Sequence, residues 1–177
     1  MKKLISFFLA VLMIIVVSNN YKEDYYIIPK ESIRIRIIPN SNNPKDQYLK
    51  KQVKLNLEEE LYNDLKDSKS IESSRIIITK NLSNYDKNIK NVLNQEQSDL
   101  KYKIDYGYHY FPEKTYKGVK YKEGNYESLL ITLGNGQGDN WWCVLFPPIC
   151  KIEEETNSKT NKIEYKLFIK ELIEKYR

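Results

Sequence analysis

The sequence predicts an α+β domain whose mixed, largely antiparallel sheet carries helices mainly on one face. Three observations lead to this fold class. Two amphipathic helical patterns occur in the first half of the chain, several short segments with a period of two follow them, and a third helical pattern closes the chain. Glycines separate the period-two segments, as expected for turns between antiparallel strands.

The first strand and the first helix are predicted from residues 33 to 66. Isoleucines alternate with Arg34 and Arg36, which predicts a strand over Ile33–Ile37 with one apolar and one cationic face. Asn43 is a suitable N-cap and Pro44 suits the first helical position. Leucine or valine then recurs at every fourth residue, so an amphipathic helix is expected over Pro44–Lys66.

The remaining elements follow from the same two periods. The β-branched run in Arg75–Thr79 predicts a short buried strand. A second helix is expected over Ser83–Glu96, and a third over Lys162–Arg177. Further strands are expected over Tyr102–Tyr110, which has an aromatic face, and over Val119–Tyr121, Ser128–Leu133 and Trp141–Phe146.

The N-terminus has the layout of an export signal. Lys2 and Lys3 precede an apolar run, Leu4–Val17, which is too short for the roughly 20 residues of a membrane-spanning helix. Residues 1–18 are therefore expected to be a signal peptide, with an uncleaved signal anchor as the alternative. Residues 19–32 are expected to be a spacer, residues 33–150 a single domain, and residues 151–161 a linker before the C-terminal helix at 162–177.

Composition excludes some classes of function. The net charge of +5 is small and spread along the chain, so nucleic-acid binding is not expected, although the excess suits work near an anionic membrane surface. The chain has only two cysteines and one histidine, His109, which cannot complete a zinc site; neither a metal nor another cofactor is expected. In an exported chain Cys143 and Cys150 are expected to form a disulfide, and two reduced thiols are the alternative.

The segment GDNWWCVLFPPIC, residues 138–150, is the strongest local pattern. Trp141 and Trp142 are adjacent, so in a strand they point to opposite faces. Either both are covered by neighbouring segments, or one is exposed and anchors a partner, since tryptophan is enriched at binding hot spots. The preceding segment, Gly134–Asp139, joins two predicted strands, which favours a hairpin turn over a phosphate-binding loop.

No catalytic set is evident. His109 has no nucleophile and orienting carboxylate placed beside it by the sequence, so a catalytic role is not expected. Glu113, Glu127 and Asp139 are candidate carboxylates for a glycosidase, but any chain of this size offers such residues.

Several motifs resemble the stage II sporulation protein R family. They are IRIRIIPNS at 33–41, Asp46-Gln47, YGYHYFPEKTY at 106–116, GNYESL at 124–129 and GDNWWCVLFPPIC at 138–150, in collinear order. His109 and Leu130 depart from the residues expected at their positions, so neither is assigned a family function. The family has no catalytic residues to carry over.

The resemblance implies a signalling protein. Members are made in the forespore and exported into the space between the two membranes of the sporulating cell, where they activate a membrane-embedded aspartic peptidase, facing the mother cell, that processes pro-sigma-E. The resemblance thus implies an activator and not an enzyme. The residues that we expect to contact this peptidase are Trp141, Trp142, Arg34, Arg36, Tyr108 and Tyr110. The alternatives are a secreted hydrolase or carbohydrate-binding protein of the cell wall, and a passive structural component of the intermembrane space.

Overall fold

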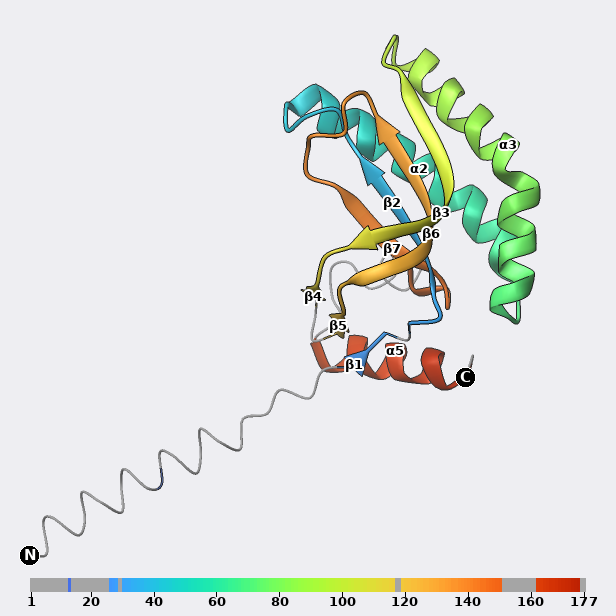
Figure 1. Ribbon diagram of the computed structural model, residues 1–177, viewed down its shortest axis with the longest axis vertical. Coiled ribbons are helices and arrows are strands. Elements are labelled where there is room, and N and C mark those ends of the chain that lie inside the picture. Colours follow the sequence, from blue (N-terminus) through green and yellow to red (C-terminus); the bar gives the residue numbers. More distant parts are fainter. Residues whose placement is uncertain (1–12, 14–25, 29, 117–118, 151–161, 176–177) are drawn as a thin grey trace, which may run out of the picture.

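The computed structural model describes residues 13, 26–28, 30–116, 119–150 and 162–175 (Figure 1). The predicted export signal, apart from Met13, and the predicted linker at 151–161 lie outside these residues. No helix among the described residues is long and apolar enough to cross a membrane. The elements, in order, are β1 (Tyr26–Ile27), β2 (Ile33–Ile38), α2 (Pro44–Leu65), α3 (Ile71–Gln95), β3 (Tyr102–Phe111), β4 (Lys114–Tyr116), β5 (Val119–Tyr121), β6 (Gly124–Leu133), β7 (Trp141–Phe146) and α5 (Lys162–Lys175).

The main sheet has four strands in the order β3-β6-β2-β7. β6 pairs with β3 in antiparallel and with β2 in parallel orientation, and β2 pairs with β7 in antiparallel orientation. α2 and α3 both cover one face of this sheet (Figure 1). The α+β class, the mixed, mostly antiparallel sheet and the helical layer on one face are confirmed.

The main core lies between the sheet and the two long helices. Ile33, Ile35 and Ile37 of β2 are fully buried there, opposite the apolar stripe of α2. The predicted four-residue spacing along α2 is confirmed by the burial of Leu49, Val53, Leu57, Leu61 and Leu65. α3 contributes Ile78, Tyr85, Ile89, Val92 and Leu93.

α3 begins 12 residues earlier than the predicted helix start at Ser83. The predicted strand over Arg75–Thr79 is wrong, because these residues lie within the helix. Ser70 caps the helix, since its side chain accepts a hydrogen bond from Ser73 N at 3.1 Å, and the Ser73 side chain accepts one from Ser70 N in return. Of the β-branched run, Ile78 is buried in the core while Ile76 is 66 % exposed, which is helical and not strand periodicity.

The turn expected over Gly134–Asp139 is not a hairpin, because β2 lies between β6 and β7. This connection instead crosses the end of β2 and is bonded to the loop before α2. Gly138 N donates to Pro39 O at 3.2 Å, and Asp139 N donates to the Asn42 side chain at 2.6 Å. The segment is therefore a bracing loop between two parts of the chain that lie far apart in sequence.

A second, smaller layer lies on the face of the sheet opposite the long helices. It contains the three-stranded sheet β1-β5-β4 and α5, which lies beside β1 (Figure 1). β1 pairs with β5, and Ile28 is buried in this layer, so the ordered fold starts inside the stretch that was expected to be a spacer. The reason is that Val119, Tyr121 and Ile169 offer the Ile28 side chain a second core.

Candidate partner-binding surface

The two tryptophans point to opposite faces of β7, as predicted, but neither is an exposed anchor. Trp142 is 8 % exposed and meets Tyr121 and Phe111 edge to face, with ring centroids 5.0 and 5.5 Å away. Trp141 is half-buried on the helical side, with Lys54 Nζ 5.1 Å from its ring centroid. Trp142 therefore braces the fold between the two layers, while Trp141 keeps part of its ring accessible on the helical side.

Arg34 was expected on an open cationic face and is instead fully buried. Its guanidinium carbon lies 3.4 Å from the centroid of the Tyr126 ring, and about 5 Å from Phe111 and Trp142, at 5.2 and 5.3 Å. None of its three side-chain nitrogens has a hydrogen-bond partner among the described residues. Burial lowers the pKa of Arg34 to about 10. Arg34 is thus a caged cation in the interior and offers no direct contact to a partner.

Arg36 is half-buried on the same face and ties the end of β3 to β2. Its Nη1 donates to Tyr110 O at 3.1 Å, and its guanidinium lies 5.8 Å from the centroid of Phe111. Burial lowers the pKa of Arg36. Part of the side chain remains accessible, so Arg36 belongs to the margin of a candidate surface.

Tyr108 and Tyr110 are the predicted site residues that the structure leaves on the surface. Their exposed fractions are 73 % and 55 %. They are two residues apart on β3 and therefore project from the same face of the strand. The Tyr110 hydroxyl donates to Glu123 Oε2 at 3.0 Å, which fixes that ring, while the Tyr108 ring is the most exposed aromatic among the described residues. This pair is the candidate partner-binding surface.

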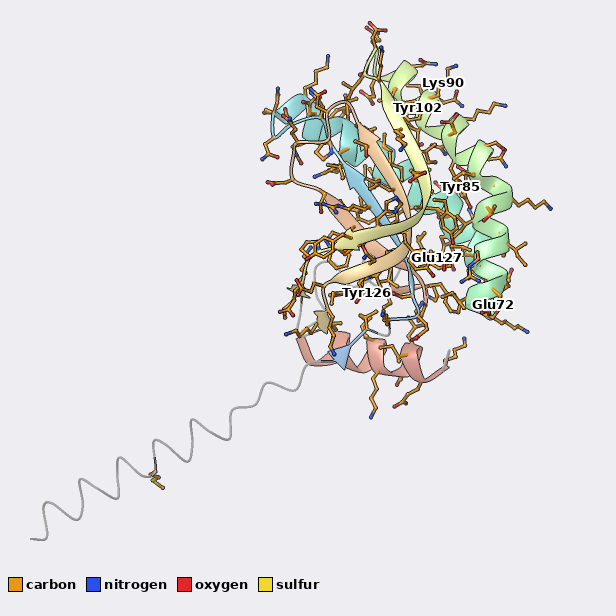
Figure 2. The ribbon with its side chains drawn as sticks, in the orientation of Figure 1. Glu72, Tyr85, Lys90, Tyr102, Tyr126 and Glu127 are labelled. Atoms are coloured by element: carbon orange, nitrogen blue, oxygen red, sulfur yellow. A yellow bond between two sulfur atoms is a disulfide. The ribbon has the colours of Figure 1, made fainter. Side chains whose placement is uncertain are left out.

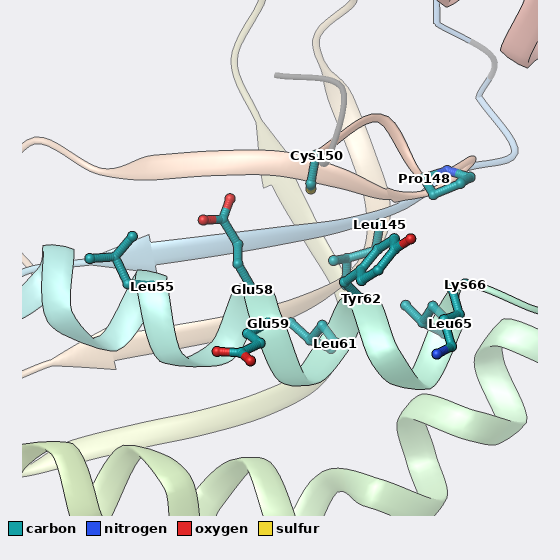
Figure 3. A pocket seen from close by; sticks show the side chains of 10 residues that line it. All are labelled: Leu55, Glu58, Glu59, Leu61, Tyr62, Leu65, Lys66, Leu145, Pro148 and Cys150. Atoms are coloured by element: carbon teal, nitrogen blue, oxygen red, sulfur yellow. The ribbon is translucent and has the colours of Figure 1, made fainter. Parts of the chain in front are cut away.

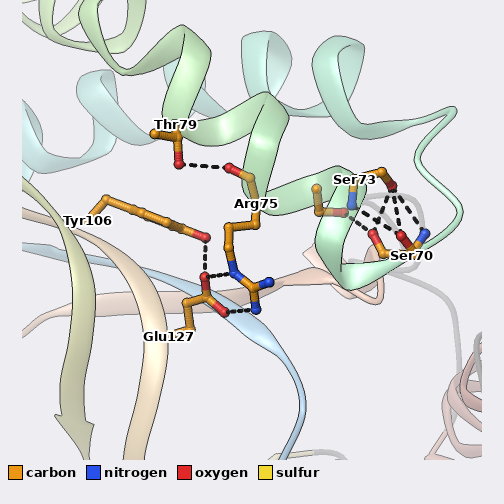
Figure 4. A network of polar contacts seen from close by, with 7 residues as sticks. Ser70, Ser73, Arg75, Thr79, Tyr106 and Glu127 are labelled. Atoms are coloured by element: carbon orange, nitrogen blue, oxygen red, sulfur yellow. Dashed lines mark hydrogen bonds and ion pairs between the residues drawn. The ribbon is translucent and has the colours of Figure 1, made fainter.

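A polar network supports the strand beneath this pair (Figure 4). Arg75 of α3 binds Glu127 of β6 through two parallel bonds of 2.7 and 2.8 Å, and the Tyr106 hydroxyl donates to the same carboxylate at 2.8 Å. The guanidinium of Arg75 lowers the pKa of Glu127, and burial raises the pKa of Tyr106. Glu127, a candidate carboxylate in the sequence, is therefore an acceptor that fixes α3 to the paired strands β3 and β6.

The upper half of β3 is fixed to α3 in a similar way. The Tyr102 hydroxyl lies between the strand and the helix (Figure 2) and donates to Asp86 O at 3.0 Å. Only the second half of β3, which runs away from α3 (Figure 1), leaves its tyrosines uncovered.

His109 does lie between a serine and a carboxylate, which the sequence analysis missed. Its Nδ1 is 2.8 Å from Ser128 Oγ and its Nε2 is 2.9 Å from Asp105 Oδ2. Asp105 and His109 are four residues apart on one strand, hence on one face, and Gly107 between them pairs with Ser128 in the register of the sheet. Ser128 is fully buried, so its hydroxyl is inaccessible to a substrate in this arrangement. The cluster ties β3 to β6.

A groove with a mostly apolar lining lies between α2 and the end of β7, beside the disulfide (Figure 3). Its volume is about 410 Å³, and Glu58, Glu59 and Lys66 stand among its lining residues. The apolar lining residues are Leu55, Leu61, Tyr62, Leu65, Leu145, Pro148 and Cys150. The groove brings no nucleophile and base together, so its chemistry is that of an apolar binding surface.

The disulfide between Cys143 and Cys150 is present, as predicted. It closes the segment that carries Pro147 and Pro148 and holds the end of β7 against the main core. Among the described residues no group of three or more histidine, cysteine or acidic side chains is placed to hold a metal ion.

Comparison with known proteins assigns this chain to a family. The family model of stage II sporulation protein R matches residues 29–156 of the sequence. The chain belongs to the stage II sporulation protein R family. Stage II sporulation protein R of Bacillus subtilis (strain 168) is 37 % identical over 149 residues, which cover 84 % of this chain and 66 % of the relative. The chain thus spans just under two thirds of that relative's length. No solved structure matches this chain.

The sporulation protein R family model extends a few residues beyond the predicted domain at both ends. At the N-terminal side the match begins next to Ile28, which is buried in the second core, so family and structure agree that the domain starts before Ile33.

Proposed function

We propose that this sporulation protein is an exported signal that activates the membrane-embedded aspartic peptidase which processes pro-sigma-E. The proposal follows from the family and from the expected export signal at residues 1–18. It places the protein in the space between the forespore and mother-cell membranes, where it links gene expression in the two cells. In this role the protein acts by binding the peptidase and carries out no chemistry itself.

The observation that carries the proposal is the exposed pair Tyr108 and Tyr110. Large aromatic side chains on a surface contribute strongly to protein–protein binding because they bury much area and lose little entropy. Beneath them, the bonds between Arg75, Glu127 and Tyr106 fix the strand, so the pair is presented on a rigid support. Arg36 lies at the margin of the same surface, because its guanidinium donates a hydrogen bond to Tyr110 O.

The candidates for wall hydrolysis lack such support. The Glu113 carboxylate is paired with Lys120 Nζ at 3.0 Å, and Glu127 is occupied by Arg75 and Tyr106. The Ser128 hydroxyl beside His109 is fully buried. No observation favours a hydrolase over the signalling role.

Co-expression tests the proposal. The full chain is expressed with the peptidase and pro-sigma-E in a host that does not sporulate, and processing is followed by immunoblot. We expect processing to depend on the chain and to fall about tenfold or more in the double variant Tyr108→Ser, Tyr110→Ser, since hot-spot aromatics contribute about 2 kcal/mol or more. Tyr48→Ser is the matched control, because Tyr48 is exposed on α2, away from this surface. Equal processing with and without the chain would refute the role.

A further inference from the structure

The outer edge of β3 is an unpaired strand edge. β3 is the first strand of the sheet, and among the described residues only β6 pairs with it. All ten residues of β3 take part in that pairing, from Tyr102 opposite Leu133 to Phe111 opposite Gly124. A strand at the edge of a sheet presents a row of unpaired backbone N–H and C=O groups that can template another strand.

The register shows which residues present these groups. Gly134 N donates to Lys101 O at 2.7 Å, so Lys101 belongs to a hydrogen-bonded pair of the antiparallel ladder. Because hydrogen-bonded and non-hydrogen-bonded pairs alternate, the even-numbered residues of β3 direct their N–H and C=O away from β6. These residues include Tyr106, Tyr108 and Tyr110. Of their outward carbonyls, that of Tyr110 is already bonded by Arg36 Nη1.

The second half of β3 lacks two features that often protect an edge strand, a bulge and a proline, and its charged residues Lys103 and Asp105 lie in the first half. Its pairing with β6 runs without a register shift, and it contains no proline. At the opposite edge, β7 is only six residues long, its pairing with β2 has a register shift, and Pro147 follows it directly. Short length, irregularity and proline are the means by which sheet edges avoid added strands. β3 is therefore the edge that is suited to recognition.

The side chains beside the open edge restrict what can bind there. On one face, Tyr108 and Tyr110 offer exposed rings, and the Tyr110 hydroxyl contacts Glu123. On the other face, the Asp105 side chain is 48 % exposed beside His109. Exposed aromatic rings thus lie on one face of this stretch of β3, and the carboxylates of Asp105 and Glu123 lie close to it.

We propose that an extended segment of the partner pairs with Tyr106–Tyr110 as an added strand of the sheet. The segment would place β-branched or aromatic side chains beside Tyr108 and Tyr110, and a lysine or arginine beside Asp105. Backbone hydrogen bonds supply affinity in such complexes, and the alternate side chains supply specificity. The inference rests on the proposed function in taking the partner to be the extracytoplasmic part of the peptidase. A second copy of this chain is less suited, because a five-residue stretch with outward backbone groups at only three positions offers far less area than the roughly 2,000 Å² of an obligate dimer.

Proline at position 108 tests the edge directly. Tyr108 N–H points away from β6, so Tyr108→Pro removes an outward donor and leaves the β3–β6 ladder intact. Tyr108→Val removes the same ring but keeps the N–H, and so isolates the backbone contribution. With the full chain, the peptidase and pro-sigma-E co-expressed, we expect processing with the proline variant to be about tenfold below that with the valine variant. Processing within twofold for the two variants would overturn the inference.

A photo-cross-linking residue gives a second readout on the intact chain, and it decides the matter if the proline variant fails to fold. Placed at position 108 it is expected to capture the peptidase, and placed at position 48 on α2 it is expected not to do so. Capture of a second copy of the chain at 108, or no capture there, overturns the inference. Capture of the peptidase at 108 without any effect of the chain on processing would instead refute the proposed function and leave the edge contact standing.

Discussion

Replacing Arg34 with methionine is expected to stabilise the protein slightly. Arg34 is fully buried, and its side-chain nitrogens have no hydrogen-bond partner among the described residues. Burial lowers the pKa of Arg34 from its ordinary value to about 10, which corresponds to a penalty of about 3 kcal/mol for the charged guanidinium in the folded state. The contacts with the aromatic rings, led by Tyr126 at 3.4 Å, return about 2 kcal/mol. Arg34→Met removes both contributions at similar volume, so the free energy of unfolding should rise by about 1 kcal/mol.

Urea unfolding at pH 7 with the disulfide intact measures this change, which corresponds to about 0.5 M in the midpoint for a domain of this size. Arg34→Lys is the contrasting variant: the ammonium keeps the charge but is more strongly hydrated and cannot stack flat on Tyr126, so a loss of about 2 kcal/mol is expected. A loss of more than 1 kcal/mol in Arg34→Met would show that the cage stabilises the cation more than burial opposes it. Since Arg34 is not at the surface, the proposed function predicts that Arg34→Met leaves processing of pro-sigma-E in the co-expression assay unchanged.

Three further changes test other parts of the fold. Glu127→Gln should cost about 2 kcal/mol at pH 7, because it removes the charge between Arg75 and Tyr106 while Arg75 remains 42 % exposed. Because the folded-state pKa of Glu127 lies below its ordinary value, this contribution is complete above about pH 4.3 and is lost as the pH falls through the folded-state pKa, so the difference between wild type and variant in urea unfolding should shrink as the pH is lowered below about 4.3. The double variant Cys143→Ser, Cys150→Ser opens a loop with a sequence separation of 7 and should lose about 2 to 3 kcal/mol in thermal unfolding; an unchanged melting temperature would contradict a stabilising disulfide. Gly138→Ala would bring a Cβ against the Ser41 backbone carbonyl and should cost about 2 kcal/mol by the same assay, whereas Gly107→Ala, which meets nothing within 4 Å, is the control.

The sequence predicted those elements whose period and end signals agree. α2 has Pro44 at its start and an apolar residue at every fourth position, and it ends within one residue of the predicted end. The predicted second helix is shorter than α3, because three consecutive isoleucines, Ile76–Ile78, favour a strand locally. The helix prevails there because Ser70 and Ser73 cap it and because burial of Ile78 against the sheet outweighs a propensity difference of less than 1 kcal/mol.

The candidate site was predicted less completely, because a period of two gives the face of a residue and not what covers that face. The alternation placed Arg34 opposite the apolar face of β2 and separated Trp141 from Trp142, but it did not show that the return of β3 and the layer of β4, β5 and α5 cover the side that carries Arg34 and Trp142. Ser128 and His109 come together only through the β3–β6 register, which no local pattern reveals. The alternation alone identified Tyr108 and Tyr110 as a pair on one face of a strand. They are exposed because the helices do not cover the second half of β3.

The aromatic cage around Arg34 and the open edge of β3 lie on two sides of the same bent pair of strands, β3 and β6. The second half of β3 turns across the sheet (Figure 1), and Arg36 holds it there through Tyr110 O. The inner side of this turn brings Phe111 over Arg34 and Trp142, while the outer side turns Tyr108 away from the helices. A variant that loosens the cage would therefore also move the edge, which is why the effect of an edge variant on activation must be compared at equal stability. Gly107→Ala provides such a comparison, because the added Cβ meets nothing within 4 Å and no aromatic group of the cage or the edge is removed.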